Sequence, residues 1–158
     1  MFIDNPIKDQ LDLKIIDTVF DPNIYGASEN PVLPRNAKSD EMKFNVHYYE
    51  RDGTFNYQVW LFLAGNDLPF VDKVTYQLHE SFDEPFRTVN RTPANPDCRL
   101  VIWTWGIFQV NANIYDKNNR LYVLTHQLNY GNQLKEFNDK IKSIPENPEA
   151  TFGATLVA

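Results

Sequence analysis

Short runs of alternating apolar and polar residues begin at Met42 and recur through much of the 158-residue chain. Apolar side chains occupy every second position in two of these runs, Met42, Phe44, Val46, Tyr48 and then Phe108, Val110, Ala112, Ile114. Successive side chains of a β-strand point to opposite faces, so this period indicates strands with one buried face. A chain dominated by this pattern cannot be a helical bundle.

Turn-forming residues separate these runs. Asp52-Gly53 is suited to a tight hairpin, because both central positions of that turn take positive φ. We expect strands at residues 42–48, 57–64, 70–79, 99–103, 108–114 and 121–128. The run 57–64 is apolar on both faces, as in a central strand. Such a series predicts an all-β fold, an antiparallel β-sandwich or barrel over residues 42–130.

Other patterns occupy the two ends. Residues 1–41 form an irregular lead-in rich in turn signals, with one strand-like run at 13–20 that either joins a sheet edge or packs as an arm. Apolar residues at helical spacing predict a C-terminal amphipathic helix over 131–145, ended by Pro145. The tail, 146–158, is expected to be flexible. This length suits one domain.

Composition argues against several classes of protein. No apolar run approaches the roughly 18 residues of a membrane helix, and the N-terminus lacks a signal-peptide pattern. A net charge of −6 disfavours direct binding to nucleic acid, although basic peptides stay open as partners. The single cysteine, Cys98, excludes an internal disulfide. We expect a cytoplasmic protein, or a nuclear one if the source is eukaryotic.

The residues that could carry catalysis form weak patterns. His47, His79 and His126 belong to three different expected strands and have no metal-binding spacing. Cys98 has the pattern of a small residue entering a strand. His79 and Ser81 could pair, but no third group or oxyanion elbow accompanies them. We expect no cofactor, no metal and no enzymatic activity.

Large aromatic residues lie where expected strands begin and end. Residues 78–82 read Leu-His-Glu-Ser-Phe, and residues 103–108 read Trp-Thr-Trp-Gly-Ile-Phe. Trp103 and Phe108 fit the strand alternation and are expected in the core. Phe82 and Trp105 fit poorly in a core, and loops on a rigid scaffold commonly carry binding. These two rings therefore indicate an exposed recognition site.

Residues 70–82, which end in Leu-His-Glu-Ser-Phe, closely resemble the central signature of YEATS domains. Residues 60–63 (Trp-Leu-Phe-Leu) match the family's preceding strand, and residues 104–108 resemble its glycine-aromatic loop. The resemblance covers about residues 42–130. It implies an immunoglobulin-like β-sandwich that reads acylated lysine without catalysis, to which the helical spacing adds a short C-terminal helix.

The sequence also departs from the family pattern. Thr104 stands where the family usually has glycine, and the first aromatic loop of the family could correspond to either Phe55 or Tyr57. The segment between Leu128 and the expected helix is compressed. These differences favour a divergent, prokaryotic-type domain over a histone-reading nuclear subunit.

The resemblance implies a binding site made of His79, Ser81, Phe82, Thr104, Trp105, Gly106, Phe55 and Tyr57. The expected ligand is an acylated-lysine peptide or protein, whose flat acyl-amide lies between the Phe82 and Trp105 rings. Ser81 would accept from the amide N–H, and the Trp105 backbone N–H would donate to the acyl carbonyl. A longer unsaturated acyl group, such as crotonyl, would overlap the rings better than acetyl.

Two alternatives remain at this level. The chain could be a structural or protein-interaction β-sandwich that docks through its edge strands or the 13–20 run. It could instead be a hydrolase that uses Ser81 and His79, which is the weaker of the two.

Overall fold

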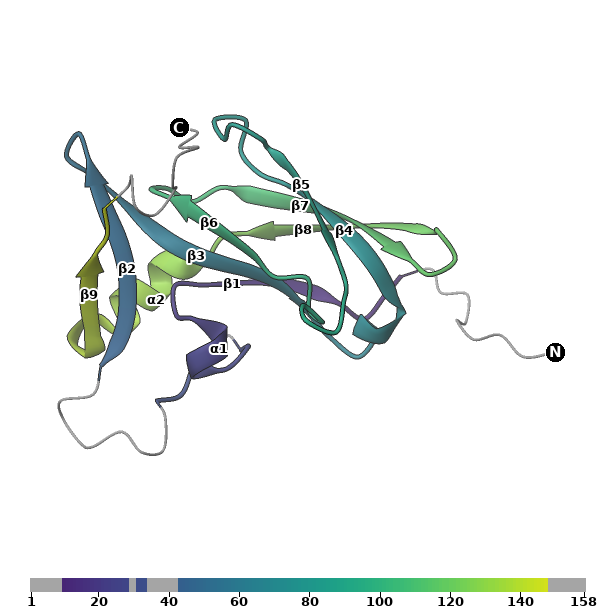
Figure 1. Ribbon diagram of the computed structural model, residues 1–158, viewed down its shortest axis with the longest axis horizontal. Coiled ribbons are helices and arrows are strands. Elements are labelled where there is room, and N and C mark those ends of the chain that lie inside the picture. Colours follow the sequence, from purple (N-terminus) through teal and green to yellow (C-terminus); the bar gives the residue numbers. More distant parts are fainter. Residues whose placement is uncertain (1–9, 29–30, 34–42, 148–158) are drawn as a thin grey trace. The chain divides into compact units, whose positions relative to one another are not determined.

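The computed structural model describes residues 10–28, 31–33 and 43–147. Within these residues the chain is mainly β-structure, with two short α-helices (Figure 1). The elements are β1 (Lys14–Thr18), α1 (Pro22–Tyr25), β2 (Phe44–Arg51), β3 (Thr54–Ala64), β4 (Val71–Gln77), β5 (Phe86–Asn90), β6 (Leu100–Thr104), β7 (Gln109–Asp116), β8 (Leu121–Gln127), α2 (Tyr130–Glu136) and β9 (Ile141–Pro145). Short 3-10 turns lie at Leu68–Phe70 and Asn138–Lys140. The helices of the described residues are too short to cross a lipid bilayer.

The strands form two sheets. One has the order β1-β3-β2-β9, with β6 also paired to β3, and the other has the order β5-β4-β7-β8. All the pairs in the second sheet are antiparallel. In the first sheet β2 and β9 are parallel, so this sheet is mixed and not purely antiparallel as expected.

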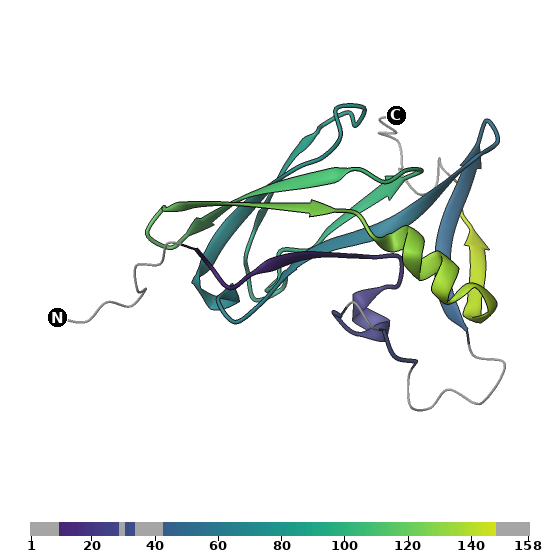
Figure 2. The same ribbon diagram turned by 180° about the vertical axis from the view of Figure 1, so that it is seen from behind.

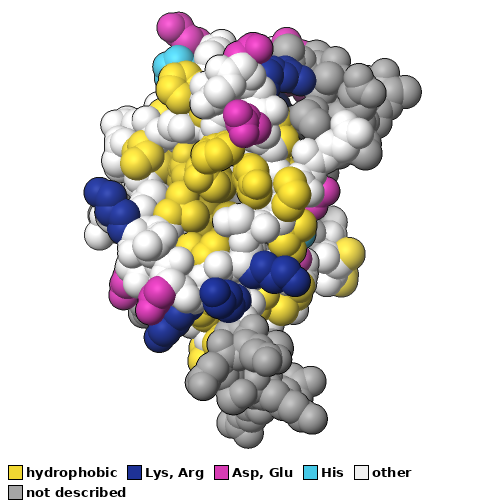
Figure 3. All heavy atoms as spheres, turned by 90° about the vertical axis from the view of Figure 1, so that its left-hand side faces the viewer, with side chains coloured by type: hydrophobic (Ala, Val, Ile, Leu, Met, Phe, Trp, Pro, Cys, Tyr) yellow, Lys and Arg dark blue, Asp and Glu magenta, His cyan; other side chains and the backbone are white. Residues whose placement is uncertain are grey.

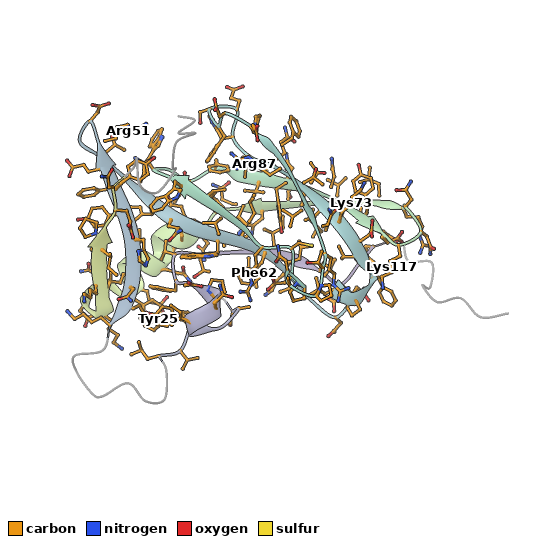
Figure 4. All side chains as sticks on the ribbon, viewed as in Figure 1. Tyr25, Arg51, Phe62, Lys73, Arg87 and Lys117 are labelled. Carbon is orange, nitrogen blue, oxygen red and sulfur yellow. The ribbon has the colours of Figure 1, made fainter. Side chains whose placement is uncertain are left out.

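The chain divides into two compact units, each described by itself. The first contains residues 1–16, 61–100 and 108–127, and the second contains residues 17–60, 101–107 and 128–158. The first unit includes segments of both sheets, and side chains from both are fully buried, such as Leu61 and Phe62 of β3 and Val74 and Tyr76 of β4. Phe62 is labelled in Figure 4. The expected fold class, an immunoglobulin-like β-sandwich with a short C-terminal helix, is confirmed.

Aromatic side chains form the core of the second unit. The Phe44 ring of β2 lies 4.7 Å from Phe20, 5.1 Å from Tyr25 and 5.4 Å from Phe137, measured between ring centroids. Phe137 follows α2, which is seen best from behind in Figure 2. Tyr25, at the end of α1, is labelled in Figure 4. These contacts bury Phe44, which lies on the face of β2 that the alternation predicted.

Local chemistry explains the main turns. Asp52 and Gly53 have φ values of 53° and 79°, which join β2 to β3 as the Asp-Gly pair predicted. Between β7 and β8, the Asp116 carboxylate accepts from the backbone N–H groups of Asn118 and Arg120. Asn119 takes a positive φ of 63° there. Both turns lie where the sequence placed them.

The C-terminal prediction was wrong beyond residue 136. α2 covers only Tyr130–Glu136, and residues 141–145 form β9 instead of continuing the helix. Asn138 and Asp139 are poor helix formers, and the chain turns there in a 3-10 conformation. Pairing with β2 then satisfies the backbone of Ile141–Pro145. The expected flexible tail lies outside the described residues from residue 148 onward.

Two strands were not predicted. β9 was read as helix, and β5 carries few apolar residues because it lies at an edge of its sheet. The strand-like run at 13–20 contains β1, which lies at the edge of the first sheet. A short helix, α1, follows it, with the Asp21 side chain accepting from the Asn23 N–H. Much of the remaining lead-in, residues 1–9, 29–30 and 34–41, lies outside the described residues.

Candidate binding site

A tight turn follows β4 and contains three of the expected site residues. The Phe82 N–H donates to the His79 carbonyl over 3.0 Å, which closes the turn over residues 79–82. The Leu78 N–H donates to the Pro85 carbonyl over 2.7 Å and closes the wider loop. His79 and Ser81 are exposed and Phe82 is half-buried. The end of β4 therefore presents a histidine, a serine and a phenylalanine together.

The hydrogen bonds of this turn orient the Ser81 hydroxyl. The Ser81 backbone N–H donates to His79 Nδ1 over 3.1 Å, and Ser81 Oγ lies 2.8 Å from the same nitrogen. A backbone N–H can only donate, so Nδ1 is the acceptor and the ring proton of neutral His79 lies on Nε2. The Ser81 hydroxyl therefore also donates to Nδ1. Its lone pairs are left to accept a hydrogen bond from a ligand.

Phe108 supports this turn from the position just before β7. Its ring centroid lies 5.4 Å from that of Phe82 and 6.1 Å from that of His79, with both pairs tilted. Phe108 is half-buried, so its assignment to the ordinary core was wrong. The alternation predicted a strand that includes Phe108, but β7 begins only at Gln109, so Phe108 lies outside the strand. Trp103, also expected in the core, is half-buried as well and lies 5.3 Å from Tyr49.

The second group of expected site residues lies after β6. Trp105 is 69% exposed, whereas Thr104 on its N-terminal side is only 4% exposed. The Thr104 hydroxyl accepts from the Gly106 N–H over 3.3 Å and lies 3.2 Å from the Gly106 carbonyl oxygen, to which it can donate. The Thr104 side chain thus faces inward and holds the loop. The Trp105 ring, in contrast, faces solvent.

Phe55 and Tyr57 both belong to a cluster of rings on the β2–β3 hairpin. Tyr48 lies 5.2 Å from Phe55 and 6.5 Å from Tyr57, and Tyr57 lies 6.2 Å from Tyr130. Phe55 is 48% exposed and Tyr57 is half-buried. Burial raises the pKa of Tyr57, and the neighbouring Tyr48 raises it further. Hydrophobic side chains gather on the side of the molecule that carries β2 and β9 (Figure 3).

The eight expected residues therefore form two groups. His79, Ser81 and Phe82 belong to the first unit, and the other five, Thr104, Trp105, Gly106, Phe55 and Tyr57, belong to the second. The facing of Phe82 and Trp105 across a slot stays a prediction. Sequence reasoning missed Tyr48 and Tyr130, which contact Tyr57. The period of two in 42–48 could have indicated Tyr48, but no local signal pointed to Tyr130.

The histidines and the cysteine that were considered for metal binding or nucleophilic chemistry lie in surroundings that favour a structural role. The described residues contain no cluster of three or more histidine, cysteine or acidic side chains that could hold a metal ion. His47 Nδ1 lies 2.7 Å from Glu146 Oε1. Cys98 is fully buried just before β6, and burial raises the pKa of its thiol to about 11. A thiol with this pKa is a poor nucleophile near neutral pH.

Residues 53–129 match the family model of the prokaryotic YEATS domain. None of the curated proteins compared with the chain matches it. Among solved structures, the chain is similar to the Yaf9 YEATS domain recognising an H3K122suc peptide, with 23% identity over 47% of this chain and 58% of that one, at a TM-score of 0.40.

The chain is also similar to the yeast AF-9 homolog protein Yaf9, with 21% identity over 63% of this chain and 58% of that one. A third similar structure is the Yaf9 YEATS domain bound to H3K27ac, with 17% identity over 79% of this chain and 78% of that one. Both have TM-scores of 0.40. The chain thus spans 58% of the length of the first two structures.

Proposed function

We propose that the chain, whose residues 53–129 match the prokaryotic YEATS domain, is a non-catalytic reader of acylated lysine. The observation that carries the proposal is the hydrogen-bonded turn at the end of β4. There the Ser81 hydroxyl is oriented by His79 and lies next in sequence to the Phe82 ring. An acyl-amide requires such an arrangement, an acceptor for its N–H beside an apolar wall.

In the proposed complex, the amide N–H of the acyl-lysine donates to Ser81 Oγ, and its carbonyl accepts from the Trp105 backbone N–H. Each hydrogen bond is worth about 1 kcal/mol net, and a buried group left without its partner costs more. The flat acyl group stacks on Phe82 and Trp105, and each ring adds about 0.5–1.5 kcal/mol beyond the buried area. Against the cost of association, these contacts amount to an affinity that is roughly micromolar or weaker.

Covalent geometry supports the participation of both rings. Phe108 contacts Phe82 with 5.4 Å between the ring centroids, and Trp105 precedes Phe108 by three residues. Three residues of fully extended chain span at most about 11 Å. The Trp105 backbone is therefore joined to Phe108 by a short covalent link. The proposal adds that the Trp105 ring lies opposite Phe82, with the acyl group between them.

The same chemistry rejects unmodified lysine. An ammonium group has three donors and no acceptor, so it cannot receive the Trp105 N–H. Moving its charge between two rings also costs desolvation, which the cation–π attraction offsets only in part. An unsaturated, planar acyl group covers more ring surface than acetyl does. We therefore expect crotonyl-lysine to bind more tightly than acetyl-lysine, and free lysine not to bind measurably.

Calorimetric titration with one peptide in crotonylated, acetylated and unmodified form tests the proposal. We expect saturable binding of the acylated forms, with an affinity that falls about five- to thirtyfold in Ser81→Ala, Phe82→Ala and Trp105→Ala. Leu121→Ala is the matched control, because Leu121 is 53% exposed and pairs with the end of β7 farthest from Phe108. If no acylated peptide binds at millimolar concentration, the reader function is abandoned.

The outcome also separates the alternatives. A protein that binds no acyl-lysine but captures a partner through its β1 edge would be an interaction module. A hydrolase would become labelled at Ser81 by a serine-reactive phosphonate. The geometry disfavours that reaction, since the described residues place no carboxylate on His79 to orient it as in a triad.

A further inference from the structure

The N-terminus of α2 is tied to the end of β1 and to the residue that follows it. The Asp17 carboxylate accepts from the Asn129 N–H at 2.9 and 3.0 Å and from the Tyr130 N–H at 2.8 Å. Farther along the helix, Gln133 Oε1 accepts from the Val19 N–H over 3.0 Å. Asn129 is exposed, and the other residues that make these bonds are buried. The first turn of α2 is therefore fixed in the second unit by contacts from residues 17–19.

Tyr130, the first residue of α2, reaches from this fixed turn to the loop that carries Trp105. Its hydroxyl donates to the Gly106 carbonyl over 2.8 Å, and only 3% of the residue is exposed. Burial raises the pKa of Tyr130 to about 12. A hydrogen bond with Thr104 acts to lower this pKa, and the charges of Asp17 and Tyr57 act to raise it. The hydroxyl is thus a donor throughout the physiological pH range.

The loop also packs against α2 at the next residue. A side chain at Gly131 would bring its Cβ to 3.1 Å from Ile107 Cδ1, so the helix surface and the loop already touch here. Gly106 has no side chain of its own to pack. Its position therefore depends on its hydrogen bonds, with the Tyr130 hydroxyl on its carbonyl and the Thr104 hydroxyl on its N–H.

We propose that Tyr130 is a positioning residue for the Trp105 loop, and that it acts from a helix turn which Asp17 holds in place. The Gly106 N–H belongs to the peptide plane shared with the Trp105 carbonyl, and the Gly106 carbonyl belongs to the next plane. Holding both planes fixes the C-terminal side of Trp105, while β6 holds its N-terminal side through Thr104. The Trp105 ring and backbone N–H are then presented in one direction instead of several.

This inference deepens the proposed function and rests on it. It places two contributors outside the segment that matches the family model, Tyr130 directly after that segment and Asp17 far before it. A rigid loop has less entropy to lose on binding, so the acyl-lysine affinity should depend on the Tyr130 hydroxyl although that hydroxyl touches no ligand.

The test compares Tyr130→Phe with Tyr25→Phe. Tyr25 is a matched control, because it is a buried tyrosine of the same unit whose hydroxyl also bonds to the backbone, as acceptor from the Asn45 N–H at 3.1 Å. One readout is amide hydrogen exchange of the ligand-free protein by NMR. The other is calorimetric titration with Nα-acetyl-Nε-crotonyl-lysine amide as the probe.

We expect the Gly106 and Ile107 amides to exchange at least about tenfold faster in Tyr130→Phe, and the probe to bind about five- to thirtyfold more weakly. Tyr25→Phe should change neither readout beyond what its loss of stability explains. Equal exchange and equal binding in the two variants would overturn the proposal. If Tyr130→Phe does not fold, Thr104→Val removes the other hydroxyl from Gly106 and must give the same local increase in exchange.

The two readouts keep the two proposals apart. If the wild-type protein does not bind the probe, the reader function fails, but the exchange measurement still decides whether Tyr130 holds the loop. If the probe binds and exchange at residues 105–107 is the same in all variants, the positioning role fails and the reader function stands.

Discussion

Phe82 and Phe108 are predicted to stabilise the folded protein as a coupled pair. The rings lie 5.4 Å apart between centroids, at an interplanar angle of 59°. Aromatic pairs at 4.5–7 Å typically contribute about 0.5–1.5 kcal/mol beyond the area they bury. Truncating one ring to alanine removes this term, so truncating the second ring cannot remove it again.

The size of each single effect follows from burial. A fully buried phenylalanine costs about 3–5 kcal/mol when replaced by alanine, and both rings here are half-buried. We therefore expect about 2 kcal/mol for Phe108→Ala and somewhat less for Phe82→Ala, because Phe108 also contacts His79 at 6.1 Å. The double variant should lose about 0.5–1.5 kcal/mol less than the sum of the two.

Urea unfolding of the wild type, both single variants and the double variant measures this coupling without any ligand. The control cycle combines Phe108→Ala with Leu121→Ala, since Leu121 pairs with Tyr115, seven residues along the chain from Phe108. That separation is about 23 Å in an extended strand, and distant sites add within about 0.3–0.5 kcal/mol. If the losses in the free energy of unfolding add equally well in both cycles, the contact between Phe82 and Phe108 is refuted, and with it the aromatic support of the turn.

Three further outcomes follow from single features of the structure. Gly65→Ala should lower the free energy of unfolding by about 3 kcal/mol or more in thermal melts, because its Cβ would lie 2.1 Å from the Asp12 carbonyl oxygen; Gly106→Ala, with nothing within 4 Å, should have little effect. Burial alone would raise the pKa of Asp116, but hydrogen bonds from the loop and the Arg120 guanidinium lower it below 3.8. The stability that the ionised Asp116 carboxylate contributes above about pH 3.8 is therefore lost as the pH falls through its lowered native pKa. Asp116→Asn should remove this contribution from the pH dependence of the free energy of unfolding. Because the pKa of Cys98 is raised to about 11, a disulfide reagent at pH 8 should react with it only after denaturant unfolds the protein.

Features that depend on neighbours in the chain were predictable. The Asp52-Gly53 hairpin follows from the positive φ of both residues, and β7 follows from the alternation of Val110, Ala112 and Ile114. The exposure of Trp105 follows from a large ring in a loop between strands. In each case the deciding property, a backbone preference or a period of two, is local.

Features that depend on distant partners were not predictable. Residues 141–145 have helical spacing of Ile141 and Ile144, yet they form β9 because β2 offers a strand with which to pair. Phe108 fits the strand period but lies against Phe82, which is 26 positions earlier. A sequence pattern records the spacing of apolar side chains but not the surface that will cover them.

The sequence by itself determined the all-β class of the chain and its match to the YEATS family over residues 53–129, because the strand period and the Leu-His-Glu-Ser-Phe motif are properties of neighbouring residues. It also named the serine and the aromatic residues on which acyl-lysine binding is proposed to depend. Only the tertiary structure decided how those residues are held. The hydroxyl of Tyr130 reaches Gly106 across 24 positions, and Asp17 reaches Tyr130 across 113. Such contacts arise when the chain folds back on itself to satisfy buried polar groups, and their partners leave no periodic signal in the sequence.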